Sequence, residues 1–129
     1  MYGLHFLGDF DPTFAASQYA LAKKFLIESA LGFCVVREFP EGVPARSDVD
    51  SGLLILGAGP SASGFAIAAA AINADRSTAM QLLKASAVVG LPVFHNDELQ
   101  FLSMPAVGQA VILFGKTELL KSAGSSDRK

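Results

Sequence analysis

Residues 51–74 read SGLLILGAGPSASGFAIAAAAINA, and this stretch decides what kind of fold the chain can adopt. It carries no charged side chain over 24 residues, which is long enough by count to cross a bilayer. Pro60 stands in its middle, however, and proline breaks a continuous helix. We therefore expect two buried segments joined by a turn. The first, residues 53–56, fits a strand and a buried helix equally well, because four apolar residues show no decisive period.

The second segment predicts a helix over residues 61–74. Gly64, Ala68 and Ala71 lie on one face of that helix, and small residues at this spacing allow a second helix to approach closely. No polar side chain occurs between Ser63 and Asn73. A helix without a polar face must lie in the interior of the fold.

Three further helices are expected around this central one, each with its own start and stop signals. The first covers residues 12–31, from an Asp11 cap and Pro12 to a stop at Gly32. The second follows the turn 75–78 and ends at Gly90, and the third runs from a Ser103 cap to about residue 122. Residues 33–36 fit a short strand, residues 1–11 alternate loosely, and residues 91–98 read as a polar-tipped loop. The result is a mainly all-α fold with room for one or two short strands, a single domain over 1–122 and a flexible tail over 123–129.

Composition bounds the function. With 129 residues, 51% apolar and 17% charged, the chain is one well-packed domain rather than a disordered segment. A net charge of −2 argues against a nucleic-acid partner. The single Cys34 excludes an intrachain disulfide or a cysteine-based zinc site, and with two histidines we expect no metal centre. The apolar neighbours of Cys34 predict an inert, buried thiol. The N-terminus lacks the features of a signal peptide, so a cytoplasmic location is the default expectation.

Charge is concentrated in residues 37–51, which hold six of the 22 charged residues of the chain. A long connection of this kind is often functional. Two carboxylates there, Asp48 and Asp50, have the spacing for acid–base catalysis, although helix capping and loop hydrogen bonds are the commoner use of such residues. The binding candidates beside them are Arg37, Glu38, Ser51 and, in the loop after residue 90, His95.

Residues 57–62, GAGPSA, also look like the glycine-rich turn of flavin- or nicotinamide-binding proteins, which holds a pyrophosphate at a helix N-terminus. More than fifty residues precede this turn, and no clear second strand ending in an acidic residue follows it. A break between closely packed helices is the preferred interpretation. The sequence therefore leaves any cofactor unknown.

Residues 37–42, 47–52 and 57–65 together resemble the C-terminal part of bacterial α/α-toroid proteins. That group includes linalool dehydratase/isomerase-like and six-hairpin glycosidase-like domains. Residues 105–117 are similar to the closing helix of such proteins. The resemblance implies helical hairpins of a partial toroid, with the loop 37–51 at the cleft end where a small molecule or carbohydrate binds.

Two functions from different classes follow from these observations. The first is a helical domain that binds a small molecule or carbohydrate at the charged loop, with or without catalysis. The alternative is a non-catalytic oligomerisation or protein-interaction module, and a flavin- or nicotinamide-binding domain ranks third. Helices this apolar on several faces cannot all be covered within one short chain, so we expect a homo-oligomer, most simply a dimer. A membrane surface is the weaker alternative for the apolar faces.

Overall fold

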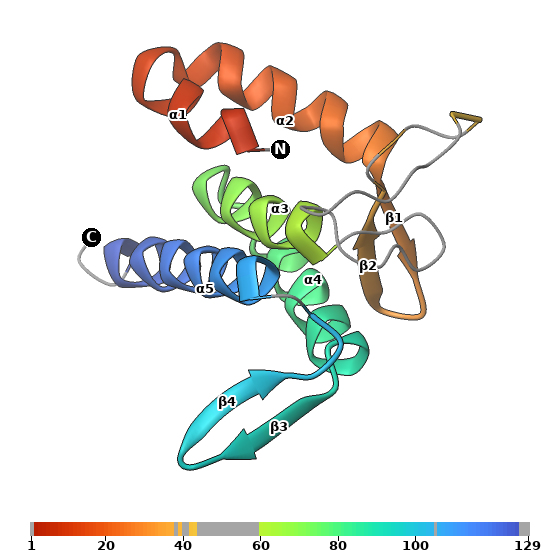
Figure 1. Cartoon of the computed structure of the whole chain (residues 1–129). Helices are drawn as coiled ribbons and strands as arrows, with labels where there is room; N and C mark the ends of the chain where they lie inside the picture. The colour runs from red at the N-terminus through yellow and green to blue at the C-terminus, as the bar shows by residue number, and fades with distance from the viewer. Residues whose placement is uncertain (1, 38, 40–41, 44–59, 105, 127–129) are drawn as a thin grey trace.

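The computed structural model describes residues 2–37, 39, 42–43, 60–104 and 106–126. Within them the chain is mostly helical, as predicted, and two small antiparallel hairpins accompany the helices (Figure 1). The helices are α1 (Tyr2–Phe10), α2 (Pro12–Leu26), α3 (Pro60–Ile72), α4 (Arg76–Val89) and α5 (Ala106–Ser126). The strands are β1 (Ile27–Ala30), β2 (Phe33–Val36), β3 (Pro92–His95) and β4 (Glu98–Phe101).

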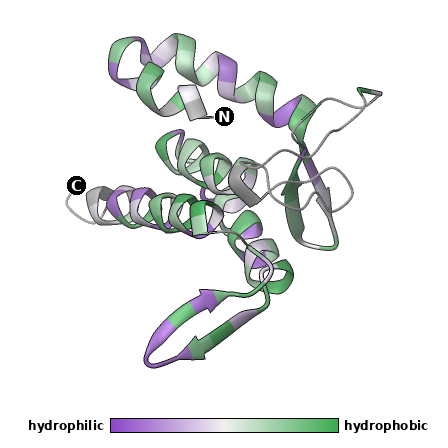
Figure 2. Ribbon diagram, in the orientation of Figure 1, coloured by the Kyte–Doolittle hydropathy of each residue, from purple (hydrophilic) through white to green (hydrophobic). Residues whose placement is uncertain are grey.

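Helix α3 occupies the centre of the structure, as its lack of polar side chains predicts. Every residue from position 66 to position 71 is buried. Helices α1, α4 and α5 all pack against it, and Figure 1 shows it between the α1–α2 pair and α5. Figure 2 shows the same helix as apolar along most of its described length. A helix of alanines can be surrounded in this way because its side chains leave room for neighbours on several sides.

The closest contact in the fold joins α3 to α5 through glycine. A Cβ added to Gly64 would lie 2.7 Å from Cγ1 of Val111 and 2.9 Å from the backbone nitrogen of Ile112. A Cβ on Gly115 would lie 2.8 Å from the carbonyl oxygen of Gly64. The predicted close approach at Gly64 is therefore confirmed. Its partner on α5 is a second glycine that the sequence analysis did not single out.

Two clusters of buried side chains form the core. The larger one surrounds α3 and includes Ile67, Leu82 and Val36, all nearly inaccessible to solvent. The smaller one lies at the start of α5, around Ile112 and the base of the β3–β4 hairpin. Leu83 of α4 packs against both clusters and so connects them.

The N-terminal region differs from its prediction in two places. Residues 2–10 form a helix rather than a loosely alternating segment, and Leu4 is buried against the core while Leu7 packs beside it. Helix α2 starts at the predicted Asp11 cap, whose Oδ1 accepts a hydrogen bond from the Phe14 N–H at 2.9 Å. It then ends at Leu26 instead of continuing to residue 31.

The early end of α2 follows from strand pairing. Ile27 adopts extended backbone angles and pairs with Val36, and the register continues to the turn. The turn residues Leu31 and Gly32 have φ values of 53° and 81°. Gly32 therefore serves a two-residue hairpin turn rather than a helix stop. The strand at residues 33–36 is confirmed.

The C-terminal region also contains more regular structure than predicted. Residues 92–101 form a hairpin, where a polar-tipped loop was expected, because Asn96 and Asp97 take φ values of 50° and 61° and close a tight turn. The Ser103 hydroxyl does not start the last helix but donates to the Val89 carbonyl oxygen at 2.6 Å. Helix α5 reaches residue 126, so residues 123–126 are helical where a flexible tail was expected.

Among the helices that the structure describes, none combines the length and the apolar composition that a membrane span requires.

Gly64→Ala should lower the free energy of unfolding by about 1–3 kcal/mol, because the new methyl group meets the α5 backbone and forces the helices apart. Urea unfolding followed by circular dichroism measures the change. Gly124→Ala is the matched control, since nothing lies within 4 Å of a Cβ there, and it should be neutral or stabilising by up to about 1 kcal/mol. Equal stability of both variants would contradict the close α3–α5 contact.

Candidate functional sites

Most of the residues that the sequence analysis proposed as a site lie outside the described part of the chain. This applies to Glu38, Asp48, Asp50 and Ser51, and to positions 57–59 of the glycine-rich turn. The described candidates are Arg37 and His95.

Arg37 lies directly after β2 and is held at two points. Its backbone N–H donates to the carbonyl oxygen of Leu26 at 2.8 Å. One guanidinium nitrogen donates to Oε1 of Glu28 on β1 at 2.6 Å, in an ion pair that is partly open to solvent. The arginine is thus fixed at the point where the chain enters residues 38–51.

His95 closes the other hairpin. It ends β3, lies opposite Glu98 in the strand register and is exposed. The hairpin that carries Arg37 and the hairpin that carries His95 are separate sheets in separate parts of the structure (Figure 1). The two described candidates therefore do not form one site.

A polar cluster that the sequence did not reveal links α2 to α4. Asp75 is the N-cap of α4, and its Oδ1 accepts a hydrogen bond from the Thr78 N–H at 3.2 Å. Its Oδ2 accepts a hydrogen bond from the Tyr19 hydroxyl at 2.8 Å and one from Nζ of Lys23 at 2.5 Å. Tyr19 and Lys23 lie one turn apart on α2, so one carboxylate fastens this helix to the start of α4.

The protonation states in this cluster are fixed near neutral pH. Burial opposes ionisation of Asp75, but the hydrogen bonds from Lys23, Tyr19 and Thr78 outweigh it and lower its pKa to about 2. Burial and the hydrogen bond to the Asp75 carboxylate raise the pKa of Tyr19 well above its usual range. Because the tyrosine stays protonated and the carboxylate stays ionised, the hydrogen bond between them is structural, and the two groups do not act as an acid–base pair.

Cys34 lies near this cluster and is buried, as predicted. Its thiol lies 3.0 Å from the Ser29 hydroxyl oxygen and donates to Oε1 of Gln81 at 3.1 Å. These contacts join the β1–β2 hairpin to α4. Across the described ranges, no group of three or more histidine, cysteine or acidic side chains is placed to hold a metal ion.

A cavity of about 270 Å³ lies between α5 and the β3–β4 hairpin. Gln109 holds this junction together, because its amide accepts from the Phe101 N–H at 3.3 Å and donates to the carbonyl oxygens of Phe101 and Met104. Nζ of Lys116 lies 5.5 Å from the centre of the Phe101 ring. We call this cavity the α5–hairpin groove; its lining residues are Leu99, Phe101, Gln109, Ala110, Ile112, Leu113 and Lys116.

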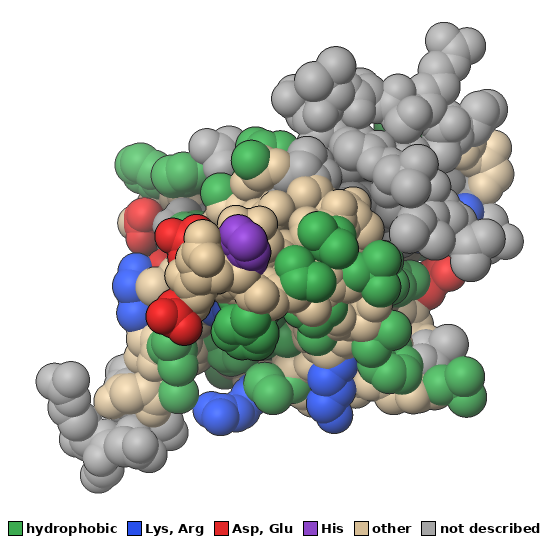
Figure 3. Space-filling view, turned by 60° about the horizontal axis from the view of Figure 1, so that its bottom comes forward, with side chains coloured by type: hydrophobic (Ala, Val, Ile, Leu, Met, Phe, Trp, Pro, Cys, Tyr) green, Lys and Arg blue, Asp and Glu red, His purple; other side chains and the backbone are tan. Residues whose placement is uncertain are grey.

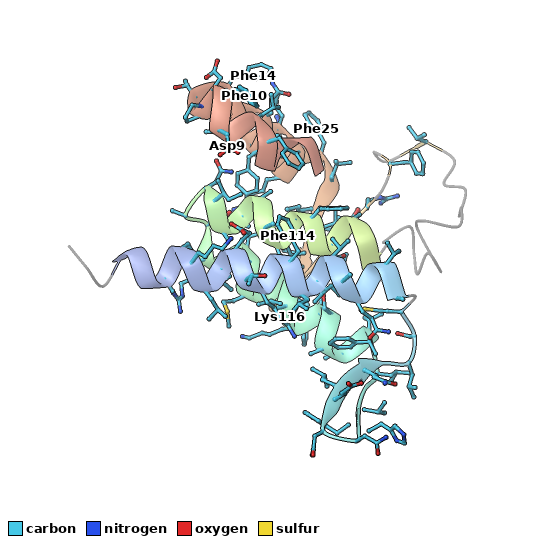
Figure 4. All side chains as sticks on the ribbon, turned by 60° about the vertical axis from the view of Figure 1, so that its left-hand side comes forward. Asp9, Phe10, Phe14, Phe25, Phe114 and Lys116 are labelled. Carbon is cyan, nitrogen blue, oxygen red and sulfur yellow. The ribbon has the colours of Figure 1, made fainter. Side chains whose placement is uncertain are left out.

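Large apolar side chains are exposed on two separate faces. One face consists of the β3–β4 hairpin and the outer side of α5, and Figure 3 shows apolar side chains gathered on the side of the molecule seen from below. The other belongs to α1 and α2, where Figure 4 labels three phenylalanines away from α3 and α5. The second set comprises Phe6, Phe10, Phe14, Leu21 and Phe25.

The chain was compared with protein-family models, with curated proteins and with solved structures, and none of the three comparisons found a match. The groove and the Asp75 cluster must therefore be interpreted from their own geometry. One pattern in the sequence could have indicated the groove, namely the apolar repeat along residues 106–124. The Asp75 cluster had none, since its partners are more than 50 residues apart.

Asp75→Asn should remove stability that depends on pH. The pKa of Asp75 is lower in the folded chain than in the unfolded chain, so the wild type keeps this contribution above about pH 4 and loses it as the pH falls toward 2. With Lys23 partly exposed to solvent, we expect a loss of about 1–2 kcal/mol at pH 7. Urea unfolding at pH 7, 4 and 2.5 measures it, and the difference between the variant and the wild type should be smallest at the lowest pH. Asp9→Asn, at an exposed position of α1, is the control. The same dependence of stability on pH in Asp75→Asn as in the wild type would contradict the assignment.

Proposed function

We propose that this chain is a non-catalytic interaction module that assembles with further copies of itself. The observation that carries the proposal is that α5 has a second apolar face, about 100° around the helix from its buried face. Its inner face packs on α3 and at the hairpin base, with Ile112 and Leu119 buried. Its outer face leaves Leu113 and Leu120 exposed at 65% and 71%. A helix that is apolar around most of its circumference is normally covered on both sides.

The number of exposed large side chains supports this proposal. Phe10, Phe94 and Leu31 are each at least 80% exposed, and they lie on different elements. Single exposed apolar residues are ordinary on a soluble protein, but contiguous apolar patches mark interaction sites. The polar clusters around Asp75 and Cys34 hold helices and strands together through hydrogen bonds. We assign them a structural role, and they supply no reactive group to either apolar face. A cytoplasmic location is proposed with this function, since the single thiol is buried and unpaired with another cysteine.

Binding of a small molecule or carbohydrate is the second candidate, and one observation favours it. Arg37 is held by Glu28 and by the Leu26 backbone, so a fixed cation directly precedes, in the sequence, the segment 38–51 that contains Asp48 and Asp50. The resemblance to partial α/α toroids predicts a cleft at that segment. A helical domain of toroid type with this loop as its site therefore stays a proposal.

Self-association is the first test. Sedimentation velocity between about 1 and 100 µM should give a species with twice the chain mass of 13.5 kDa, and the melting temperature should rise with protein concentration because association stabilises the folded state. A single monomeric species over the whole range, with a constant melting temperature, would contradict the proposal.

A ligand screen by thermal shift tests the second candidate, with sugars, uronic acids and terpenoid alcohols as probes. A ligand at 100 times its dissociation constant stabilises the folded chain by about 2.7 kcal/mol, which shifts the melting temperature of a domain this size by several degrees. Asp48→Ala combined with Asp50→Ala should abolish that shift while the ligand-free melting temperature stays the same. A large fall in the ligand-free melting temperature would instead identify the two aspartates as structural caps.

A further inference from the structure

We infer that the α5–hairpin groove is occupied by α5 of a second copy, and that the two copies exchange this contact around a two-fold axis. The inference rests on the proposed self-association and assigns it to one surface. It names both the occupant and the residues that the occupant contacts.

The outer face of α5 has the residue spacing of a helix-pairing surface. Six of its exposed positions recur at alternating intervals of four and three residues, which is the repeat of coiled coils. The stripe extends over roughly 27 Å at 1.5 Å per residue. Most of its members are small or apolar, and the Thr117 hydroxyl is satisfied within the helix by the Leu113 carbonyl oxygen at 2.7 Å. The stripe consists of Ala106, Ala110, Leu113, Thr117, Leu120 and Gly124.

The groove continues this stripe onto the hairpin. Ala110 and Leu113 belong both to the stripe and to the groove lining. On the hairpin, Leu99 lines the groove and its cross-strand partner Phe94 lies on the same face of the sheet. A helix that packs on the stripe therefore also meets the apolar face of the hairpin.

The hairpin itself requires such a cover. A two-stranded hairpin is marginally stable in water without packing on one face. Here Phe101 is the buried residue of the two strands, while Phe94 and Leu99 are 80% and 41% exposed. A second helix against this face would bury both side chains and extend the packing that Phe101 makes on the same face of the hairpin.

The exposed area is close to what a stable dimer needs. At roughly 150–200 Å² for a fully exposed large side chain, the apolar residues beside the groove present on the order of 500–600 Å². A standard interface buries about 800 Å² on each partner, including its polar rim. The residues counted are Phe94, Leu99, Leu102, Leu113 and Leu120.

The charges are complementary between copies. The hairpin turn carries Asp97 and Glu98, which form no salt bridge with any residue that the structure describes. Lys116 lies on the groove side of α5, and its contact there is with an aromatic ring (Figure 4). A two-fold axis perpendicular to α5 would place both hairpins and both lysines on one side of the helix pair. Each acidic turn would then face the lysine of the other copy, and the same patch would serve both partners, as two-fold symmetry requires.

Leu113→Lys combined with Leu120→Lys tests the location of the interface. Both side chains are exposed, so the fold should persist by circular dichroism while the dissociation constant of the dimer rises at least about 100-fold. Phe14→Lys combined with Leu21→Lys, on the apolar flank of α2, is the matched control and should remain dimeric. Sedimentation equilibrium measures all three proteins.

The possible results distinguish the inference from the proposed function. A wild-type chain that stays monomeric would contradict the proposed self-association itself. A dimer that survives the α5 variant, or that is lost with the α2 variant alone, would leave self-association standing and overturn the α5 interface.

A charge exchange tests the arrangement of the hairpin. Glu98→Lys and Lys116→Glu should each weaken the dimer by about 10-fold, since each places like charges opposite one another. The combined variant should recover to within about 3-fold of the wild type, because the pair is restored with its signs exchanged. Additive losses in the combined variant would show that the hairpin does not face α5 of the partner.

Discussion

The contact between α3 and α5 is the constraint on which the rest of the structure depends. Gly64 and Gly115 each lie against backbone and side-chain atoms of the facing helix, so the two helices approach more closely than any Cβ at these positions would allow. The alanines that follow Gly64 on α3 continue this surface and let α1 and α4 approach as well. Such packing gives precise positions to the helices, because interiors at this density tolerate almost no added volume.

A core of alanine and glycine has a second consequence, which is that it buries little apolar area for each residue. Burial contributes about 0.8 kcal/mol for each methylene, and alanine contributes a single methyl group. The large side chains are then left for the periphery, where phenylalanines of α1, α2 and β3 are exposed. The small core and the large exposed apolar surface thus have one origin. The association between copies that we propose would cover that surface without any change at the centre of the fold.

Local signals predicted the ends of elements where the partner is also local. Asp11 caps its helix as expected, because a cap bonds to an amide three residues away. Asp75 caps α4 in the same way, although the helix begins inside the turn expected over residues 75–78. The same reasoning failed at residues 27–32 and 91–98. At both places a strand forms only because it pairs with a second strand. The turns also contain residues other than glycine with positive φ, among them Leu31 and Asn96, and such residues indicate a turn less clearly than glycine does. The site candidates divide similarly, since the buried thiol of Cys34 was predicted from its apolar neighbours while the cluster on Asp75 joins distant parts of the chain.

The sequence by itself determined that the chain is mainly helical, that its central helix is interior and approached closely at Gly64, and that its apolar content exceeds what a few helices can cover. These properties follow from residue size, polarity and period, which act within a few turns of helix. The tertiary structure alone decided which helix contacts that glycine, which residues bind Asp75, and that the uncovered surface includes a groove between α5 and a hairpin. These depend on contacts between residues far apart in the chain, and no local pattern encodes the partner of such a contact.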